Sequence, residues 1–469
     1  MRLLQCFFET QKYETDYSTN DLFIVFDAPF VHSIQYSREL KEALVGQYEA
    51  SREQLREEAI ASDWNFAAHA LPDSATGFVR SLCSFGATHH GHIGHLAAVL
   101  MPQSVSDGRA FAAWLSRALT AGVPERLRFI VVDSIETPRL SDLGDSVRHF
   151  SQVQTLKVDA VTIAQETFAQ EGGVGPAAVF RNYLMDVVTL IEKGSAEQVK
   201  AKAADAFAFA RKQQWTDQEV VLAVLMAGAW LKEKQFHEAA RTYQDARQGA
   251  LQTIASGHPA GQQLVLQTWF GEAGVHLAAG DVERAARCYD EAASIAKGIP
   301  HPILAIEALR MGAFCRARMG NRQDAIEKLQ SALLLGRRLK PEARVMTTLP
   351  IAAIDLLRVI EPERVERIEQ VKRRFQDRIV QSRMAVEQRA AALEAGGDVE
   401  QLRAEEKRLA VATARGEKQA VAELDMVVAQ SGEKFRRAFA EGRELLGAPW
   451  PIFCEVALPQ SQLIQAAGK

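Results

Sequence analysis

Four short stretches of the sequence repeat one arrangement of small and large side chains, and this repetition limits the folds open to the chain. Each stretch has a small residue, a large residue four positions later and a second small residue three positions after that. Spacings of four and three place all three side chains on one face of a helix. Small residues let a neighbouring helix approach closely, so each stretch predicts the second helix of a packed pair. The four triplets are Ala203–Phe207–Ala210, Ala239–Tyr243–Ala246, Ala285–Tyr289–Ala292 and Ala325–Leu329–Ala332.

The helix that precedes each of the last three triplets carries signals of its own. Gly280 and Gly320 stand where two of these pairs must turn, and glycine adopts the left-handed backbone of such turns without steric cost. Lys234 takes that place in another unit, which predicts a less regular turn there. The residues that mark the first helices are Ala227 and Trp230, Trp269 and Ala273, and Leu309 and Ala313.

The stretch from Trp269 to Ala292 resembles a tetratricopeptide repeat. In that family an aromatic residue, a small residue and a turn glycine are followed by alanine, aromatic and alanine. The triplets here begin at positions 203, 239, 285 and 325, so the units are longer than the roughly 34 residues of the standard repeat. The alternative is an irregular, alanine-rich helical domain. The resemblance implies a mainly α chain with a solenoid of helix pairs over residues 181–360, capped by a helix at Ala343–Val359. The residues that carry the resemblance are Trp269, Ala273, Gly280, Ala285, Tyr289 and Ala292.

The resemblance also implies a function, because proteins of this family usually bind other polypeptides and perform no chemistry. We therefore expect a scaffold, adaptor or chaperone-like protein, with no catalytic residue, cofactor or metal. The family lines its binding groove with fixed positions of each first helix, which here are mostly apolar or glycine. They suit an amphipathic helix or apolar segment, whereas a free C-terminal carboxylate would need a Lys, Arg or Asn cluster. The alternative is that the chain's own C-terminal helices or its Trp450–Leu458 segment fill the groove. The predicted groove residues are Val224, Leu225, Gly228, Phe270, Gly274, Leu277, Met311, Phe314 and Arg318.

Residues 1–150 differ from the rest, because β-branched and aromatic runs alternate there with helical patterns. The helices are expected at Ser37–Ile60 and Ala110–Ala121. Strands that alternate with helices predict a parallel α/β sheet. The expected strands are Leu22–Phe26, Leu96–Met101 and Phe129–Val132.

The last part of this α/β region resembles the second half of a signal-transducing P-loop NTPase domain. The resemblance lies in a strand, a helix, a Val-Pro loop and the strand Leu127–Asp133. A phosphate loop should then follow the first strand, but Asp27–Ser37 contains neither glycine nor lysine. Pro102 and Gln103 end the next strand, where a metal-holding Asp is expected. Either a nucleotide domain has lost its site or the likeness is chance, and neither reading supports hydrolysis. The alternative function is therefore a regulatory protein with a non-catalytic nucleotide-like domain.

Four histidines occur within Thr88–His95, and imidazole nitrogens are common zinc ligands. No HExxH pattern is present, and Gly91 and Gly94 indicate a loop, so the other interpretation is an exposed contact surface. Asp133 and Asp142 have no matched catalytic partner in the sequence.

The segment 151–180 is predicted to be a linker, since Glu171–Pro176 is rich in glycine without a following Lys-Ser. Residues 361–447 predict a long, coiled-coil-like helical hairpin of Arg364–Glu394 and Val399 to about Leu446, broken at Gly396–Asp398. The alternative is one extended helix that packs only in an oligomer, so these helices are candidates for self-association. Residues 448–469 form a proline-bounded tail.

Composition narrows the function further. A net charge of −4 argues against a general nucleic-acid binder. Five scattered cysteines without a CxxC pair suit a reducing, cytoplasmic setting. The apolar cluster Leu3–Phe8 is too short for a signal peptide, and no run of about 18 apolar residues predicts a membrane span.

Overall fold

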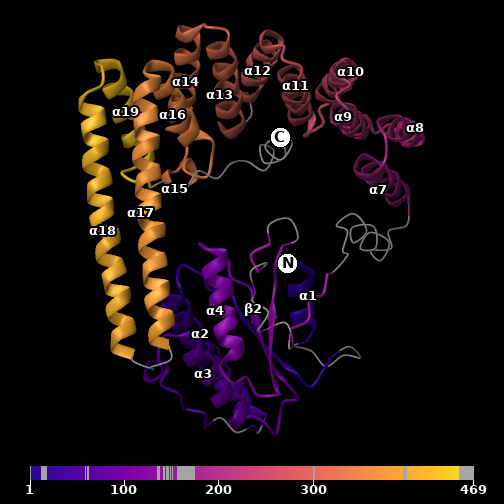
Figure 1. The fold of residues 1–469 in the computed structure, drawn as a ribbon. Coiled ribbons are helices and arrows are strands. Elements are labelled where there is room, and N and C mark those ends of the chain that lie inside the picture. The colour runs from indigo at the N-terminus through magenta and orange to yellow at the C-terminus, as the bar shows by residue number, and fades with distance from the viewer. Residues whose placement is uncertain are drawn as a thin grey trace. The chain divides into compact units, whose positions relative to one another are not determined.

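The computed structural model describes residues 2–11, 18–58, 60, 63–134, 138–140, 143, 147, 149, 151–155, 175–298, 302–394 and 399–453. Contacts divide the chain into two compact units. Unit 1 comprises Met1–Thr155 and Arg373–Gln419, and unit 2 comprises Leu156–Lys372 and Ala420–Lys469. The predicted fold class is confirmed, since the chain is mainly helical, with an α/β head, a solenoid of helix pairs and a long helical hairpin (Figure 1). Most of the predicted linker, Asp142, Gly396–Asp398 and residues 454–469 of the tail lie outside the described residues.

The sheet of unit 1 consists of three parallel strands in the order β1 (Leu22–Phe26), β2 (Leu96–Leu100) and β3 (Leu127–Val131). Every residue of β2 is buried, which explains its uninterrupted apolar run, because a central parallel strand is covered on both faces. The three predicted strands are confirmed to within one or two residues at their ends.

Helices cover both faces of this sheet. Alternate strand residues, such as Ile24, Phe26 and Leu100, pack in one core with α2 (Ser33–Glu57), α3 (Ala75–Thr88) and α4 (Gly108–Thr120). The residues between them, such as Val25 and Val99, pack with Phe8 of α1 (Arg2–Thr10). Because successive strand side chains point to opposite faces of the sheet, α2, α3 and α4 pack on one face and α1 packs on the other.

Helix α3 was not predicted from the sequence. It begins at Ser74, whose hydroxyl accepts a hydrogen bond from Gly77 N at 3.1 Å. The loop before it is fixed by Lys41 of α2, whose fully buried ammonium donates to the Ala68, Leu71 and Pro72 carbonyls and pairs with Asp73 at 2.8 Å.

The hairpin consists of α17 (Pro362–Glu394) and α18 (Val399–Ala429), which lie side by side in Figure 1. Its outer part belongs to unit 1, where Ile34 at the start of α2 is buried among Val386, Ala390, Leu402 and Leu409. Arg38 of α2 makes a bidentate ion pair with Glu406 of α18, at 2.8 Å for one of its two bonds. The segment expected to stand apart as residues 361–447 therefore contributes to both compact units.

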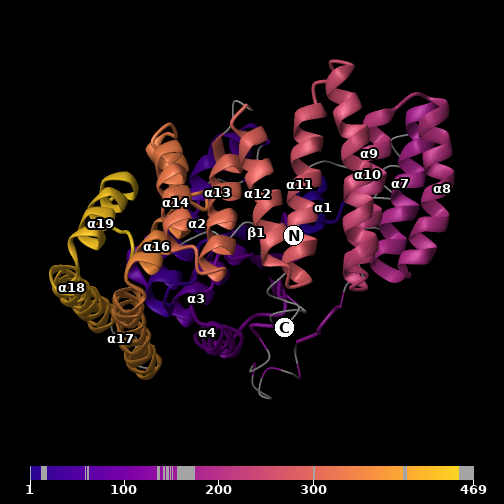
Figure 2. The ribbon, with the colours of Figure 1, turned by 90° about the horizontal axis from the view of Figure 1, so that it is seen from above.

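Unit 2 is a row of antiparallel helix pairs (Figure 2). All four small–large–small triplets lie on second helices, and each member is buried except for the half-buried Phe207. The first helices of successive pairs also contact each other: α7 contacts α9, and α9 contacts α11. The pairs are α7 (Pro176–Lys193) with α8 (Ala196–Lys212), α9 (Thr216–Lys232) with α10 (Phe236–Ala255), α11 (Gly261–Ala278) with α12 (Val282–Ala296), and α13 (Pro302–Arg318) with α14 (Arg322–Gly336).

The turns inside the pairs use left-handed residues. Gly280 and Gly320 have φ of +82° and +80°, as their positions in the sequence predict. Lys234 adopts the same conformation, with φ of +59°, so this turn is regular in geometry although its residue is not. Gln214, at φ +60°, does the same between α8 and α9.

A further helix pair closes the solenoid. It consists of α16 (Leu349–Ile360) and α19 (Glu433–Leu446), which pack against each other. A helix is present where the cap at Ala343–Val359 was expected, but its bounds and its isolation differ: the short α15 (Pro341–Arg344) precedes it, α16 begins only at Leu349, and α19 pairs with it. The prediction that the second hairpin helix continues to Leu446 is wrong, because α18 ends at Ala429 and Gly432 then caps a separate helix.

The hairpin is therefore an insertion between the two members of the last pair. Its base is closed by Glu361, whose carboxylate accepts from Gly432 N at 2.8 Å, and by Arg364, which donates to the Gln430 carbonyl at 2.6 Å. Trp450, 1% exposed, covers Gly442 of α19. None of the described helices is both long and apolar enough to cross a membrane.

Candidate functional site: the face of the first helices

The nine predicted groove residues lie on α9, α11 and α13, and we call the surface that they form the first-helix face. Each of the nine is half-buried or exposed. Neighbouring residues of the same helices that face the partner helices, such as Ala227, Ala273 and Ala313, are at most 1% exposed. Helical spacing therefore separates the first-helix face from the packed core, as the sequence indicates.

On α9, the first-helix face consists of Val224, Leu225 and Gly228. The two aliphatic side chains are half-buried and pack against the core formed with α8 and α10. A Cβ atom placed on Gly228 would meet no other atom within 4 Å. The backbone of α9 is thus directly accessible at this point, flanked by apolar side chains.

On α11, Phe270, Gly274 and Leu277 repeat this arrangement. Phe270 packs edge-on against Tyr289 of α12, with ring centroids 5.9 Å apart, so part of its ring belongs to the core. A Cβ on Gly274 would again meet nothing within 4 Å. Gly271, one position from Phe270, is different, because a Cβ there would lie 2.2 Å from the Tyr243 ring, so this glycine serves close helix packing.

On α13, Met311 packs into the core below, whereas Phe314 is 42% exposed. The Arg318 guanidinium lies 5.8 Å from the Phe314 ring centroid and carries the only charge among the nine residues. An exposed aromatic ring beside a guanidinium offers both apolar contact and a cation to a bound segment.

Sequence reasoning missed two residues of this surface. Gln263 and Gln267 are exposed on α11 and precede Phe270 by seven and three positions, which places them on the same helical stripe. The spacing that identifies Phe270 and Gly274 extends to them, but their amides carry no family signal. They add hydrogen-bonding groups to an otherwise apolar stripe.

A charged network lies beside the first-helix face on α13. Arg310 is 7% exposed and pairs with Glu307 at 2.7 Å and with Asp355 of α16 at 3.7 Å. Burial raises the pKa of the Asp355 carboxyl, while Arg310 and Arg358 oppose that shift. This network joins α13 to the closing helix pair.

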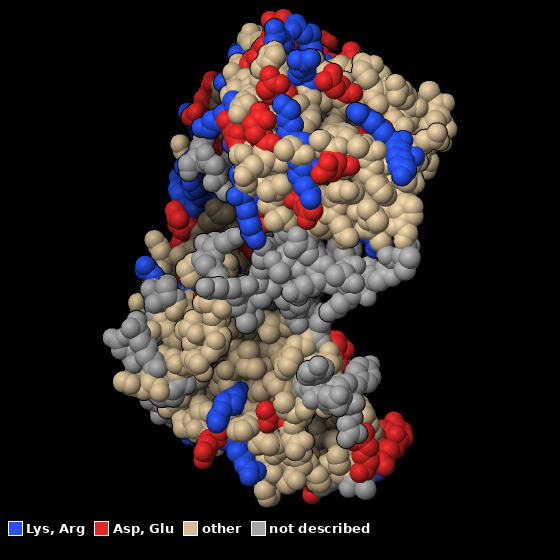
Figure 3. Space-filling model, turned by 90° about the vertical axis from the view of Figure 1, so that its right-hand side faces the viewer, with Lys and Arg blue, Asp and Glu red and all other residues tan. Residues whose placement is uncertain are grey.

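On the side of the molecule drawn in Figure 3, acidic and basic side chains are interspersed over the described surface.

The start of α2 is where a nucleotide domain would place its phosphate loop, which the sequence of Asp27–Ser37 lacks, and in the structure the chain itself occupies that position. His32 caps the helix by accepting from Gln35 N at 3.2 Å, and Ser33 N donates to the Glu387 carboxylate of α17 at 2.6 Å. Burial raises the pKa of Glu387. A phosphate-binding loop would present such N–H groups to its ligand. Here a carboxylate of the hairpin takes up the first of them.

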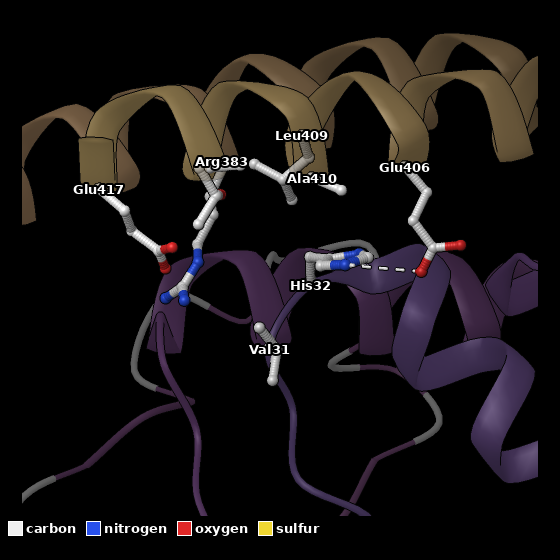
Figure 4. A pocket seen from close by; sticks show the side chains of 9 residues that line it. Val31, His32, Arg383, Glu406, Leu409, Ala410 and Glu417 are labelled. Carbon is white, nitrogen blue, oxygen red and sulfur yellow. Dashed lines mark ion pairs between the residues drawn. The ribbon is translucent and has the colours of Figure 1, made fainter. Parts of the chain in front are cut away.

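A cavity of about 450 Å³ lies beside this contact, between the Val31–His32 loop and the hairpin (Figure 4). The His32 ring points toward Glu406, with Nε2 3.8 Å from the carboxylate, while Arg383 and Glu417 extend from the hairpin. Burial lowers the pKa of His32 to about 4, with Arg38 and Arg383 adding to this shift and Glu406 opposing it.

The carboxylates at the ends of the strands are also engaged by the chain. Asp27 accepts from the Gln103 side chain at 3.1 Å. Asp133, for which the sequence offers no catalytic partner, accepts from the backbone N–H groups of Arg139 and Leu140 at 3.0 Å. Burial acts to raise the pKa of Asp133, but these hydrogen bonds outweigh it and hold the pKa below its ordinary value. The structure gives the NTPase resemblance no support.

The histidines of Thr88–His95 turn to separate partners. His89 is buried against Phe85, with ring centroids 4.7 Å apart. His90 Nδ1 lies 2.9 Å from the Ala87 carbonyl, and His95 Nδ1 lies 3.0 Å from Asp21. Among the described residues, these imidazoles do not form a group with metal-ligand geometry. The loop is held to the head by these contacts.

Comparisons with known proteins give little further guidance. No family model matches the sequence, and no curated protein matches it. A similarity search among solved structures finds the crystal structure of aspartyl phosphate phosphatase F from Bacillus subtilis. The TM-score is 0.34 and the identity 13%, with 91% of this chain and 94% of that chain covered. A likeness at this level carries no argument for fold or function, so the fold is described from the helices themselves.

Proposed function

We propose that the chain is a protein-binding scaffold, adaptor or chaperone-like protein that holds a polypeptide partner on the first-helix face. The observation that carries this proposal is the accessible stripe on three successive first helices. It combines half-buried apolar side chains with Gly228 and Gly274, whose Cβ positions are open. Small residues on an apolar stripe let a partner backbone or helix approach closely.

The chemistry of the stripe favours an amphipathic helix or an apolar segment as the partner. Phe314 and the exposed parts of Val224, Leu225 and Leu277 provide apolar contacts. Arg318 offers one positive charge at the end of the stripe, which suits a partner with an acidic residue beside its apolar face. A single arginine does not form the Lys/Arg/Asn cluster that a terminal carboxylate would require.

The open glycines allow a test that does not disturb the fold. Gly274→Arg and Gly228→Arg each attach a long, charged side chain to the first-helix face through a Cβ position that is open. Replacing a glycine inside a helix by arginine also improves helix propensity by roughly 0.5–0.8 kcal/mol. Gly46→Arg in α2 is the matched control, since its Cβ position is open as well but lies in the head.

The partner is first identified by affinity capture and mass spectrometry, and its affinity is then measured with purified components. We expect Gly228→Arg and Gly274→Arg each to bind the partner at least about tenfold more weakly, while Gly46→Arg binds it as the wild type does. Circular dichroism should show unchanged helix content in all three. Equal affinity of Gly274→Arg and wild type would show that the partner binds elsewhere.

We further propose that the chain performs no catalysis. The N–H of Ser33 and the carboxylates Asp27 and Asp133 are taken up by the chain's own groups, which supports this proposal. An ATP hydrolysis assay tests it, and we expect no turnover above background. Turnover that is lost when a residue of the 27–37 loop is changed would contradict the proposal.

Self-association through the C-terminal helices belongs to the same proposal. Val380 and Met384 of α17 and Val411 of α18 are 48%, 49% and 69% exposed. Light scattering on the full chain, compared with a Val380→Lys and Met384→Lys variant, tests whether these exposed side chains of α17 lie in an interface. A monomeric wild type would exclude it.

A further inference from the structure

A buried polar cluster lies inside the solenoid, away from the first-helix face. Glu272 and His276 stand one turn apart on α11, and Cys288 faces them from α12. Their side chains are 6%, 10% and 5% exposed. One ligand atom from each residue lies within 4.8 Å of the others, and this is the single such group among the described residues.

The three groups are a carboxylate, an imidazole and a thiol, a set that binds zinc and related divalent transition metals. In a tetrahedral zinc site with bonds of about 2.0–2.3 Å, ligand atoms lie roughly 3.3–3.7 Å apart. His276 Nε2 and Glu272 Oε1 are already 3.5 Å apart. Rotation of the side chains by less than about 1.5 Å brings the remaining ligand atoms into range.

Arg247 of α10 holds the carboxylate from its other side. Its guanidinium pairs with Glu272 Oε2 and stacks on the Trp269 ring, 3.3 Å from the centroid. Glu272 Oε1 faces His276 and accepts a hydrogen bond from the Gln244 amide. A carboxylate that is fixed through one oxygen and presents the other is the usual arrangement of a metal ligand with a supporting outer partner.

A second observation concerns the arginine beside this cluster. Arg247 is 6% exposed, and its Nη1 is buried without a hydrogen-bond acceptor among the described residues. Arg247 already pairs with Glu272 and also interacts electrostatically with Cys288, so its guanidinium would favour a thiolate at Cys288 over a neutral thiol. A metal-bound cysteine is a thiolate.

We propose that Glu272, His276 and Cys288 form a binding site for one zinc-class divalent metal ion. On binding, the metal replaces the thiol proton of Cys288, which leaves to solvent. The Gln244 amide, which now donates to Glu272 Oε1 at 2.6 Å, turns away, and its carbonyl oxygen or a water molecule takes the fourth position. Such a metal ion joins α11 to α12 and stabilises the helix that carries Gly274.

The test uses the full-length protein, stripped with a chelator and titrated with Co²⁺ alone. We expect one equivalent to bind, with the near-ultraviolet thiolate-to-cobalt charge-transfer band and the visible bands of a tetrahedral site. Cys288→Ser should lose the charge-transfer band, and His276→Asn should weaken binding by at least about tenfold. Cys315→Ser is the matched control, because this cysteine is also buried but lies outside the cluster.

Histidines of the Thr88–His95 loop could add weakly bound metal, but a site without cysteine gives no thiolate band. The absence of the band in the wild type, or its survival in Cys288→Ser, would overturn the proposal. If Cys288→Ser does not fold, X-ray absorption at the zinc edge of the wild type decides. One sulfur among the scatterers supports the site, and none refutes it.

Discussion

His32 couples the stability of unit 1 to pH. The imidazole is 8% exposed on its side chain and caps α2 by accepting from Gln35 N, which requires an unprotonated Nδ1. Burial lowers its pKa from 6.5 to about 4, with Arg38 and Arg383 adding to the shift. The folded unit therefore binds fewer protons than the unfolded chain between those two values, so its stability falls as pH decreases through this window.

The magnitude follows from the two pKa values. Relative to pH 7.5, the loss in the free energy of opening is about 2 kcal/mol at pH 5 and about 3 kcal/mol at pH 4. His32→Asn removes the titration and keeps the cap, because asparagine is among the best N-cap residues. The variant should therefore lose about 2 kcal/mol less than the wild type between pH 7.5 and pH 5.

Hydrogen exchange of peptides from Leu22–Glu57 measures this free energy in the unit concerned. Glu387, whose pKa is raised by burial, acts in the opposite direction: the stability that it contributes is present at low pH and is lost as pH rises above its ordinary value. Wild type and His32→Asn share this contribution, so it cancels in their difference. His90→Asn, an exposed histidine in the same unit, is the control. Equal pH dependence of wild type and His32→Asn would refute the reasoning.

Three further substitutions test the packing of unit 2 by urea unfolding. Lys234→Gly should stabilise the chain by about 0.5–1 kcal/mol, because the left-handed backbone costs lysine about 1–2 kcal/mol. Part of this gain is offset because glycine has more conformational entropy in the unfolded chain. An unchanged urea midpoint would contradict this prediction. Gly271→Ala should destabilise by about 1–3 kcal/mol, since its Cβ would lie 2.2 Å from the Tyr243 ring. Trp450→Ala should lower the free energy of unfolding by about 3–5 kcal/mol, because the indole is buried against Gly442. A decrease below about 1 kcal/mol would place the tryptophan outside the core.

The solenoid could be predicted from the sequence because its packing depends on the spacing of residues within each helix. The triplet Ala285–Tyr289–Ala292 and the turn at Gly280 depend only on helical period and on the left-handed backbone. The first-helix face follows from the same period. Lys234 appeared irregular by its residue type, yet the pair of helices around it imposes the glycine-like conformation, because tertiary packing outweighs the local preference.

The missed features depend on contacts between residues far apart in the chain. The break at Gly432 is weak in a helical pattern, and it is fixed by Glu361, 71 residues earlier. In the sequence, Glu387 is one of many charges on a helix that appears solvated, but its carboxylate accepts a hydrogen bond from Ser33 N, 354 positions earlier in the chain. The cluster of Glu272 and Cys288 joins two helices whose polar residues look unrelated in sequence. Spacing rules cannot predict such pairs, because they describe one element at a time.

The insertion of the hairpin has a consequence for the order in which the chain completes itself during synthesis. The sheet ends at Val131, but the residues that bury Ile34 and bind Ser33 N lie within 373–419. A growing chain that has emerged only as far as α16 has the three described strands of the head and most of the solenoid, yet lacks the cover for the start of α2. The part of the protein that is made first is therefore finished after the helices that follow it.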